Sequence, residues 1–101
     1  RTLALTIGAG QRAGLQGSAS YAGAPRAGIV MGGTGVAVVE ASNTGAFVPG
    51  DLVVGPTGWQ THSVHAAAAL RKVPAGTDPA LHLGVLGTNG LTAYFGLFDL
   101  G

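Results

Sequence analysis

Cysteine is absent from this 101-residue sequence, and charged side chains are scarce. Without cysteine the chain has neither a disulfide framework nor a thiolate zinc site. Charged residues make up 9% of the chain, against about 25% in an average soluble domain. The formal net charge is +1, and the five basic residues are scattered along the sequence. Because a nucleic-acid-binding face needs clustered basic residues, we predict no nucleic-acid partner.

Long apolar runs are also missing. No run reaches the roughly 18 consecutive apolar residues that a membrane-spanning helix requires. No signal-peptide pattern, in which charged residues precede an apolar stretch, is visible. These two observations predict a cytoplasmic protein that does not contact a membrane.

Candidate metal ligands are few and poorly spaced. His62 and His65 fall on a predicted strand with two residues between them, which places them on opposite faces. His82 is distant from both in the sequence. A metal site needs several ligands at one point, so we predict no bound metal.

Glycine and apolar residues are abundant instead. The chain has 19 glycines, and 47% of its residues are hydrophobic. Its length suits one domain, residues 1–101, with a real but modest core. With so little charge for its surface, we expect another domain, another subunit or a ligand to cover part of it. The alternative is a glycine- and alanine-rich domain with a bland, uncovered surface.

The patterning of apolar and polar residues predicts a mainly β domain that ends in a helix. Residues 2–7 are typical of a strand. Residues 28–42 indicate a long strand bent at its glycines, and residues 59–64 a further strand. Between the first two strands, residues 13–27 are rich in Gly, Ala, Ser and Pro and predict a long loop.

Two apolar faces are predicted to form the core. Alternate residues of the first strand share one face, namely Leu3, Leu5 and Ile7. The C-terminal segment, residues 91–100, has apolar residues at helical spacing, namely Leu91, Tyr94, Phe95 and Phe98. Upstream of that helix, Asp78 is expected to cap a helical turn that begins at Pro79.

Residues 47–55 read as a turn that opens a strand. Gly50 supplies a position free to take positive φ, and Asp51 can accept hydrogen bonds from nearby backbone N–H groups. Its sequence, Phe-x-x-Gly-Asp-x-Val, resembles a signature of GroES-like β-barrel domains. The chain is therefore expected to form a partial GroES-like β-barrel with a C-terminal helix.

Three blocks together carry a more specific resemblance: FVPGDLV at 47–53, GWQTHSV at 58–64 and LGVLGTNGLTAYFGL at 83–97. Their order and spacing are similar to the zinc-independent medium-chain dehydrogenases/reductases, the group of prostaglandin reductase, leukotriene B4 dehydrogenase and curcumin reductase. The resemblance implies a GroES-like domain, with residues 88–101 as the helix that links it to a Rossmann domain. In that family the Rossmann domain binds NADPH, and an α,β-unsaturated carbonyl compound is reduced in the cleft between the domains.

The sequence departs from the family at two places that face this cleft. Where the family has an Asp-Pro-Tyr-Met-Arg motif, residues 8–12 read Gly-Ala-Gly-Gln-Arg and keep only Arg12. Where the family has Gly-Met-Pro-Gly, residues 87–90 read Gly-Thr-Asn-Gly. No G-x-G-x-x-G fingerprint is present; Gly8-x-Gly10 follows a strand, but we expect no helix to begin there.

Candidate site residues gather where the resemblance places the cleft. Tyr21 is a candidate proton or hydrogen-bond donor, and Arg12 a candidate partner for a carbonyl or enolate oxygen. Alternatively, Tyr21 is only a packing anchor. Trp59 is a candidate apolar wall, or equally a core residue. The polar residues that can orient a ligand are Gln11, Thr88 and Asn89, although Asn89 also suits a helix cap.

These observations support three hypotheses. In the first, the chain is a stand-alone, cofactor-free remnant of a reductase, without a Rossmann domain, acting as a cyclase or isomerase on an unsaturated, polyketide-like carbonyl compound of secondary metabolism. In the second, it is a fragment of an NADPH-dependent double-bond reductase for enones or alkenals. In the third, it is a non-catalytic binding or assembly subunit. A homodimer is expected, because an incomplete barrel leaves strand edges that need cover.

Overall fold

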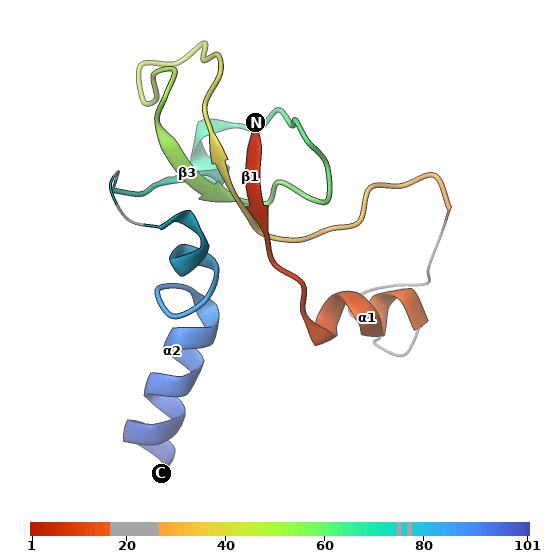
Figure 1. Cartoon of the computed structure of the whole chain (residues 1–101), viewed down its shortest axis with the longest axis vertical. Coiled ribbons are helices and arrows are strands. Elements are labelled where there is room, and N and C mark those ends of the chain that lie inside the picture. The colour runs from red at the N-terminus through yellow and green to blue at the C-terminus, as the bar shows by residue number, and fades with distance from the viewer. Residues whose placement is uncertain (17–26, 75, 77) are drawn as a thin grey trace.

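The computed structural model describes residues 1–16, 27–74, 76 and 78–101 (Figure 1). Its centre is a four-stranded antiparallel sheet in the order β1-β2-β3-β4. The strands are short: β1 spans Thr2–Leu5, β2 Gly35–Val38, β3 Leu52–Gly55 and β4 Arg71–Lys72. Among the described residues the sheet is open, with β1 and β4 at its edges, so the expected sheet is present without closure into a barrel, and helices hold more of these residues than strands do.

The core lies on the two central strands. Val36 of β2 is fully buried, and its neighbours in the sheet are Ala4 on one side and Val54 on the other. Ala37, Val53 and Val73 complete the buried apolar set. Valine suits this place because its β-branched side chain packs well on a pleated surface.

Gly35 opens β2 at a point where two other segments approach the backbone. A Cβ on Gly35 would contact Oγ1 of the buried Thr57, and would lie 2.9 Å from the carbonyl oxygen of Ala4. A glycine within a strand often marks such a close approach. The strand therefore needs glycine here for space, not for a special φ angle.

The turn before β3 forms as the sequence predicts. Gly50 has a φ of +96°, and Asp51 Oδ2 accepts a hydrogen bond from the Val48 N–H at 3.0 Å. The same carboxylate lies 3.5 Å from Lys72 Nζ of β4. Asp51 thus ties the turn to an edge strand.

The predicted core face of the first strand is wrong. Leu3 is 45% exposed and Ile7 is 83% exposed. The pairing of β1 with β2 shifts between Thr2 and Ala4, and such a bulge resets the alternation of faces. Ile7 lies beyond the end of the strand.

A helix, α1 (Ala9–Gln16), begins where a break and a loop were predicted. Gln11 Oε1 accepts a hydrogen bond from the Gly8 N–H at 2.8 Å. This is half of a capping box, in which the third residue of a helix satisfies the backbone N–H of its N-cap. The expectation that no helix follows Gly8-x-Gly10 is therefore wrong.

Two other predicted strands are shorter or missing. Of the long strand at 28–42, only β2 is regular. Residues 59–64 form no strand, because Gly58 adopts a φ of +65° and turns the chain. They still make single backbone hydrogen bonds, from Trp59 N to Met31 O and from Thr2 N to Thr61 O.

The C-terminal third is helical. Two short 3-10 helices are present, η2 (Ala67–Ala69) and η3 (Pro79–Leu83). The second agrees with the predicted turn at Pro79, and Asp78 caps it by accepting a hydrogen bond from the Ala80 N–H at 3.0 Å. The main helix α2 (Thr88–Phe95) begins at residue 88 rather than 91, and a π-helical turn, η4 (Gly96–Leu100), extends it.

The apolar stripe of α2 is not part of this chain's core. Its four residues are exposed by 50–68%, namely Leu91, Tyr94, Phe95 and Phe98. The rings pack on one another, with the Tyr94 centroid 5.4 Å from that of Phe95 and 4.9 Å from that of Phe98. Figure 1 shows α2 running away from the sheet to the C-terminus, so no other described segment covers the stripe. No helix in the described residues is long and apolar enough to cross a membrane.

Candidate active site

Two of the predicted site residues, Gln11 and Trp59, meet at Gly33. A Cβ built on Gly33 would lie 3.1 Å from Gln11 Nε2 and 3.3 Å from Trp59 Nε1. Both nitrogens carry N–H donors, since an amide nitrogen and an indole nitrogen have no acceptor capacity. Trp59 is 38% exposed, so part of its side chain is in contact with solvent.

The backbone on either side of Trp59 is fixed by pairing with residues 31–33. The Trp59 N–H donates to Met31 O at 2.8 Å, and the Gly58 N–H donates to Gly33 O at 3.0 Å. Gly58 is needed in this turn, because it has a φ of +65° and its Cβ position lies 3.2 Å from Met31 O. The backbone of Trp59 and that of Gly33 are therefore joined in one hydrogen-bonded unit.

Gln11 reaches the same point from the other side. The Gly8 N–H occupies Gln11 Oε1 and so fixes the plane of the amide group. Because Oε1 must be the acceptor in that bond, Nε2 is the atom on the Gly33 side. The segment before α1 is itself held to the sheet, with Thr6 N donating to Thr34 O at 2.9 Å.

The other predicted residues are not brought to this point by the described structure. Arg12 is exposed on α1, next to Gln11 in sequence. Thr88 and Asn89 are exposed on α2, and Figure 1 shows α1 and α2 at separate ends of the molecule. Gly87, not Asn89, is the N-cap of α2, so the prediction of an Asn89 cap is wrong. Tyr21 lies outside the described residues.

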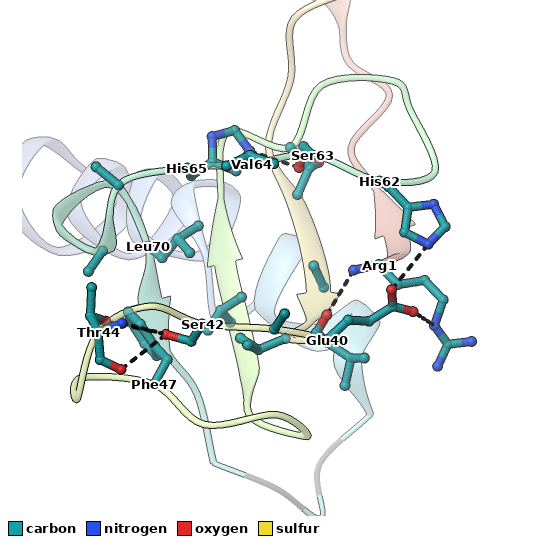
Figure 2. A pocket seen from close by; sticks show the side chains of 18 of the residues that line it. Arg1, Glu40, Ser42, Thr44, Phe47, His62, Ser63, Val64, His65 and Leu70 are labelled. Atoms are coloured by element: carbon teal, nitrogen blue, oxygen red, sulfur yellow. Dashed lines mark hydrogen bonds and ion pairs between the residues drawn. The ribbon is translucent and has the colours of Figure 1, made fainter.

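A separate hollow of about 530 Å³ lies between β2, the 41–47 loop and residues 62–70 (Figure 2). None of the predicted site residues lines it. Its apolar wall comes from β2, the 41–47 loop and the residues on either side of η2, including Val38, Phe47 and Leu70. Sequence analysis missed this hollow, because it depends on how two irregular segments fold back over β2.

One rim of the hollow is charged. Glu40 lies 3.5 Å from Arg1 Nε and 3.5 Å from His62 Nε2, as the dashed lines in Figure 2 show. His65 Nε2 pairs with Ser63 Oγ at 2.8 Å. His62 and His65 line the same hollow, so the predicted placement on opposite faces of a strand is wrong. Even so, the part of the chain that the structure describes contains no cluster of three potential metal ligands.

The described residues do not fit a dinucleotide site. The β1-Gly8-x-Gly10-α1 segment has the strand-turn-helix order of a Rossmann fingerprint, but α1 is followed by no acidic residue about 20 positions further on. The next acidic residue is Glu40, which is already paired on the rim of the hollow. We therefore assign no residue of this chain to NADPH.

Sequence reasoning overlooked Gly33 as a site residue. The pair Gly32-Gly33 was attributed to a bend in a strand, yet only Gly33 has side chains pressed against it. The signal in the sequence was the adjacent pair itself, since one of the two glycines has no local reason to be glycine.

Comparison with known proteins identifies what the chain is similar to. The family model described as the N-terminal domain of oxidoreductase matches residues 1–73. Prostaglandin reductase 1 of Bos taurus is 44% identical over 77 residues, covering 72% of this chain and 23% of the relative. The NADPH-dependent curcumin reductase of Escherichia coli is 43% identical over 75 residues, covering 73% of this chain and 21% of the relative. The match thus spans less than a quarter of either relative's length.

Proposed function

This chain belongs to the zinc-independent medium-chain dehydrogenase/reductase family, within the GroES-like N-terminal domain, and from that membership we propose that it forms part of an NADPH-dependent reductase. The proposed substrate is a small, largely apolar α,β-unsaturated aldehyde or ketone. The observation that carries the proposal is the match of residues 1–73 to the oxidoreductase N-terminal domain.

The comparisons favour the reductase over the cofactor-free cyclase or isomerase. The relatives carry reductase names, and the name of the Escherichia coli relative includes NADPH. Nothing in the match points to a cyclisation or an isomerisation. The altered family motifs at residues 8–12 and 87–90 were one of the supports for that hypothesis, and they bear on substrate choice as readily as on lost chemistry.

The geometry supports a substrate-side role for the residues around Gly33. Gln11 and Trp59 present N–H donors at an accessible point, beside the apolar face of the indole ring. Such a combination suits an apolar molecule with one carbonyl oxygen. Within the proposal, Arg12 and Tyr21 stay candidates for the oxygen-side chemistry, and Thr88 and Asn89 for ligand orientation.

The test is an assay of the gene product that carries this chain, with 2-cyclohexenone and with trans-2-hexenal. We expect NADPH absorbance to fall only when the unsaturated compound is present. Mass spectrometry should show a product that has gained two hydrogen atoms, with one NADPH consumed per product molecule. The saturated ketone cyclohexanone serves as the control and should leave NADPH unchanged.

Two other outcomes are informative. A product of unchanged mass, formed without NADPH, would contradict the reductase and establish the cyclase or isomerase hypothesis. The absence of any product, together with retention of the folded state, would contradict both enzymatic hypotheses in favour of a binding or assembly subunit.

A further inference from the structure

We propose that Gln11 Nε2 and Trp59 Nε1 form a two-donor clamp for the carbonyl oxygen of the ligand, in front of Gly33. The identity of the ligand as an unsaturated carbonyl compound rests on the proposed function. The clamp itself rests on the geometry of three residues from three separate segments of the chain.

The two donor nitrogens lie close to one point. The nitrogens lie 3.1 and 3.3 Å from a single point, the position that a Cβ of Gly33 would occupy. Hydrogen bonds from N–H groups to oxygen are about 2.9 Å long. The point itself is one bond length from Gly33 Cα, so the proposed place for the ligand oxygen is just beyond it, in contact with that Cα and facing both nitrogens. Among the described residues, neither nitrogen has a hydrogen-bond acceptor.

Hydrogen bonds hold the segments that carry the two donors. The Gln11 amide is fixed by the bond from the Gly8 N–H at 2.8 Å, and the Trp59 backbone by its bond to Met31 O at 2.8 Å. Donors that are already in position lose little conformational entropy when they bind a ligand. The Gln11 amide and the backbone that carries the indole are therefore held in place, unlike the exposed side chain of Arg12 on the same helix.

The two donors favour a neutral carbonyl group over an anion. An amide and an indole donate hydrogen bonds without carrying charge, whereas a carboxylate or phosphate is usually met by a cation. The indole N–H points outward in the plane of the ring, so a ligand whose oxygen it holds lies beyond the edge of the ring.

The role of Gly33 follows from the same distances. A methyl group at this position would sit between the two nitrogens, closer to each than most side-chain contacts allow, and would force them apart. Its neighbour Gly32 has nothing within 4 Å of its Cβ position. The two adjacent glycines thus provide a matched pair for the experiment.

The experiment is an NMR titration of the ¹⁵N-labelled chain, in which Trp59 is the only tryptophan and so gives the only indole N–H signal. The probes are 2-cyclohexenone and cyclohexene, which share a ring and a double bond but differ in the oxygen. The chain has no cysteine, so thiol addition does not consume the enone. We expect 2-cyclohexenone to shift the indole signal downfield to saturation, and cyclohexene to leave it in place.

The variants separate the hydrogen bonds from mere packing. Gln11→Glu keeps an oxygen for the Gly8 N–H but replaces the donor with an acceptor. It should weaken binding of 2-cyclohexenone about threefold to tenfold, the usual value of one neutral hydrogen bond. Gly33→Ala should weaken binding at least as much, while Gly32→Ala should bind like the original chain. The backbone spectrum of each variant verifies that it is folded.

Several results would overturn the clamp. Equal shifts with cyclohexene would show apolar contact alone, and unchanged affinity in both Gln11→Glu and Gly33→Ala would show that neither the second donor nor the open space matters. Because this titration needs no NADPH and no turnover, it stands apart from the assay of the proposed function. A clamp without reduction would refute the enzyme but not the oxygen site.

Discussion

At the scale of single residues, several positions are explained by one backbone angle or one hydrogen bond. Gly50 takes a φ of +96°, a region that L-residues with a Cβ rarely adopt. Asp51, its neighbour, satisfies the Val48 N–H and approaches Lys72. Both roles were predictable, because the Gly-Asp pair at the start of a strand encodes a turn locally and needs no tertiary partner.

Replacement of Gly50 by alanine is expected to lower the free energy of unfolding by about 1–2 kcal/mol, the cost of a left-handed backbone for a residue with a Cβ. The matched control is Gly45→Ala in the same connection, where φ is not positive and nothing lies within 4 Å of the Cβ position. The control should change stability by less than about 0.5 kcal/mol. Urea unfolding followed by Trp59 fluorescence measures both, and equal stabilities would contradict the turn assignment.

Other residues could not be placed from the sequence. Trp59 was assigned to a strand, but the φ of Gly58 turns the chain and brings the indole to Gly33. The sequence does not show how far the turn at Gly58 redirects the chain, nor which residues the indole then meets. For the same reason the approach of Gln11 to Gly33, across 21 intervening residues, has no local signal.

At the scale of elements, periodicity located the strands but not their ends or faces. The valine-rich centre of β2 and the start of β3 were predicted, since both are short apolar runs next to turn signals. The face of β1 was not, because one bulge reverses the alternation on which the prediction depends. Helix α1 was missed because its start is marked by a glutamine side chain rather than by a Ser, Thr or Asp N-cap.

The pairing of β2 with β1 depends on the small size of Gly35. Gly35→Ala would drive a methyl group into Thr57 and toward Ala4 O. Ala4 O is a backbone atom, so it cannot move aside as the end of a flexible side chain could. We expect a loss of about 3 kcal/mol or more, at the upper end of overpacking, and a chain of this size then populates the unfolded state. Circular dichroism and urea unfolding measure the change.

Gly32→Ala is the control for this prediction too. It lies three residues earlier, outside the strand, in open space. Its stability should be unchanged or slightly higher, because alanine restricts the unfolded chain more than glycine does. A Gly35→Ala variant as stable as Gly32→Ala would mean that β1 and Thr57 do not close around β2 as described.

At the scale of the whole molecule, the dominant feature is apolar surface without cover. Leu91, Tyr94, Phe95 and Phe98 form a continuous exposed stripe on α2, and the 9% content of charged residues offers little to offset it. The sequence predicted the stripe but assigned it to this chain's core. Periodicity reports that a helix face will be buried, not what will bury it.

We propose, as the sequence suggested, that copies of this chain associate when the chain is prepared alone, and the α2 stripe is the surface on which they should meet. Contiguous apolar patches of this kind drive association in water, at about 25 cal/mol for each Å² of apolar surface removed from solvent. Sedimentation equilibrium should give a mass of at least twice the 9.9 kDa of one chain. Phe98→Glu places a charge at the C-terminal end of the stripe, beside the Tyr94 ring, and should return the mass to one chain. Val64→Glu, at a residue 97% exposed and away from α2, should leave the association intact.

If Phe98→Glu and Val64→Glu give the same mass, association does not depend on α2. A single-chain mass for the unaltered protein at millimolar concentration would show that the stripe tolerates water without a partner.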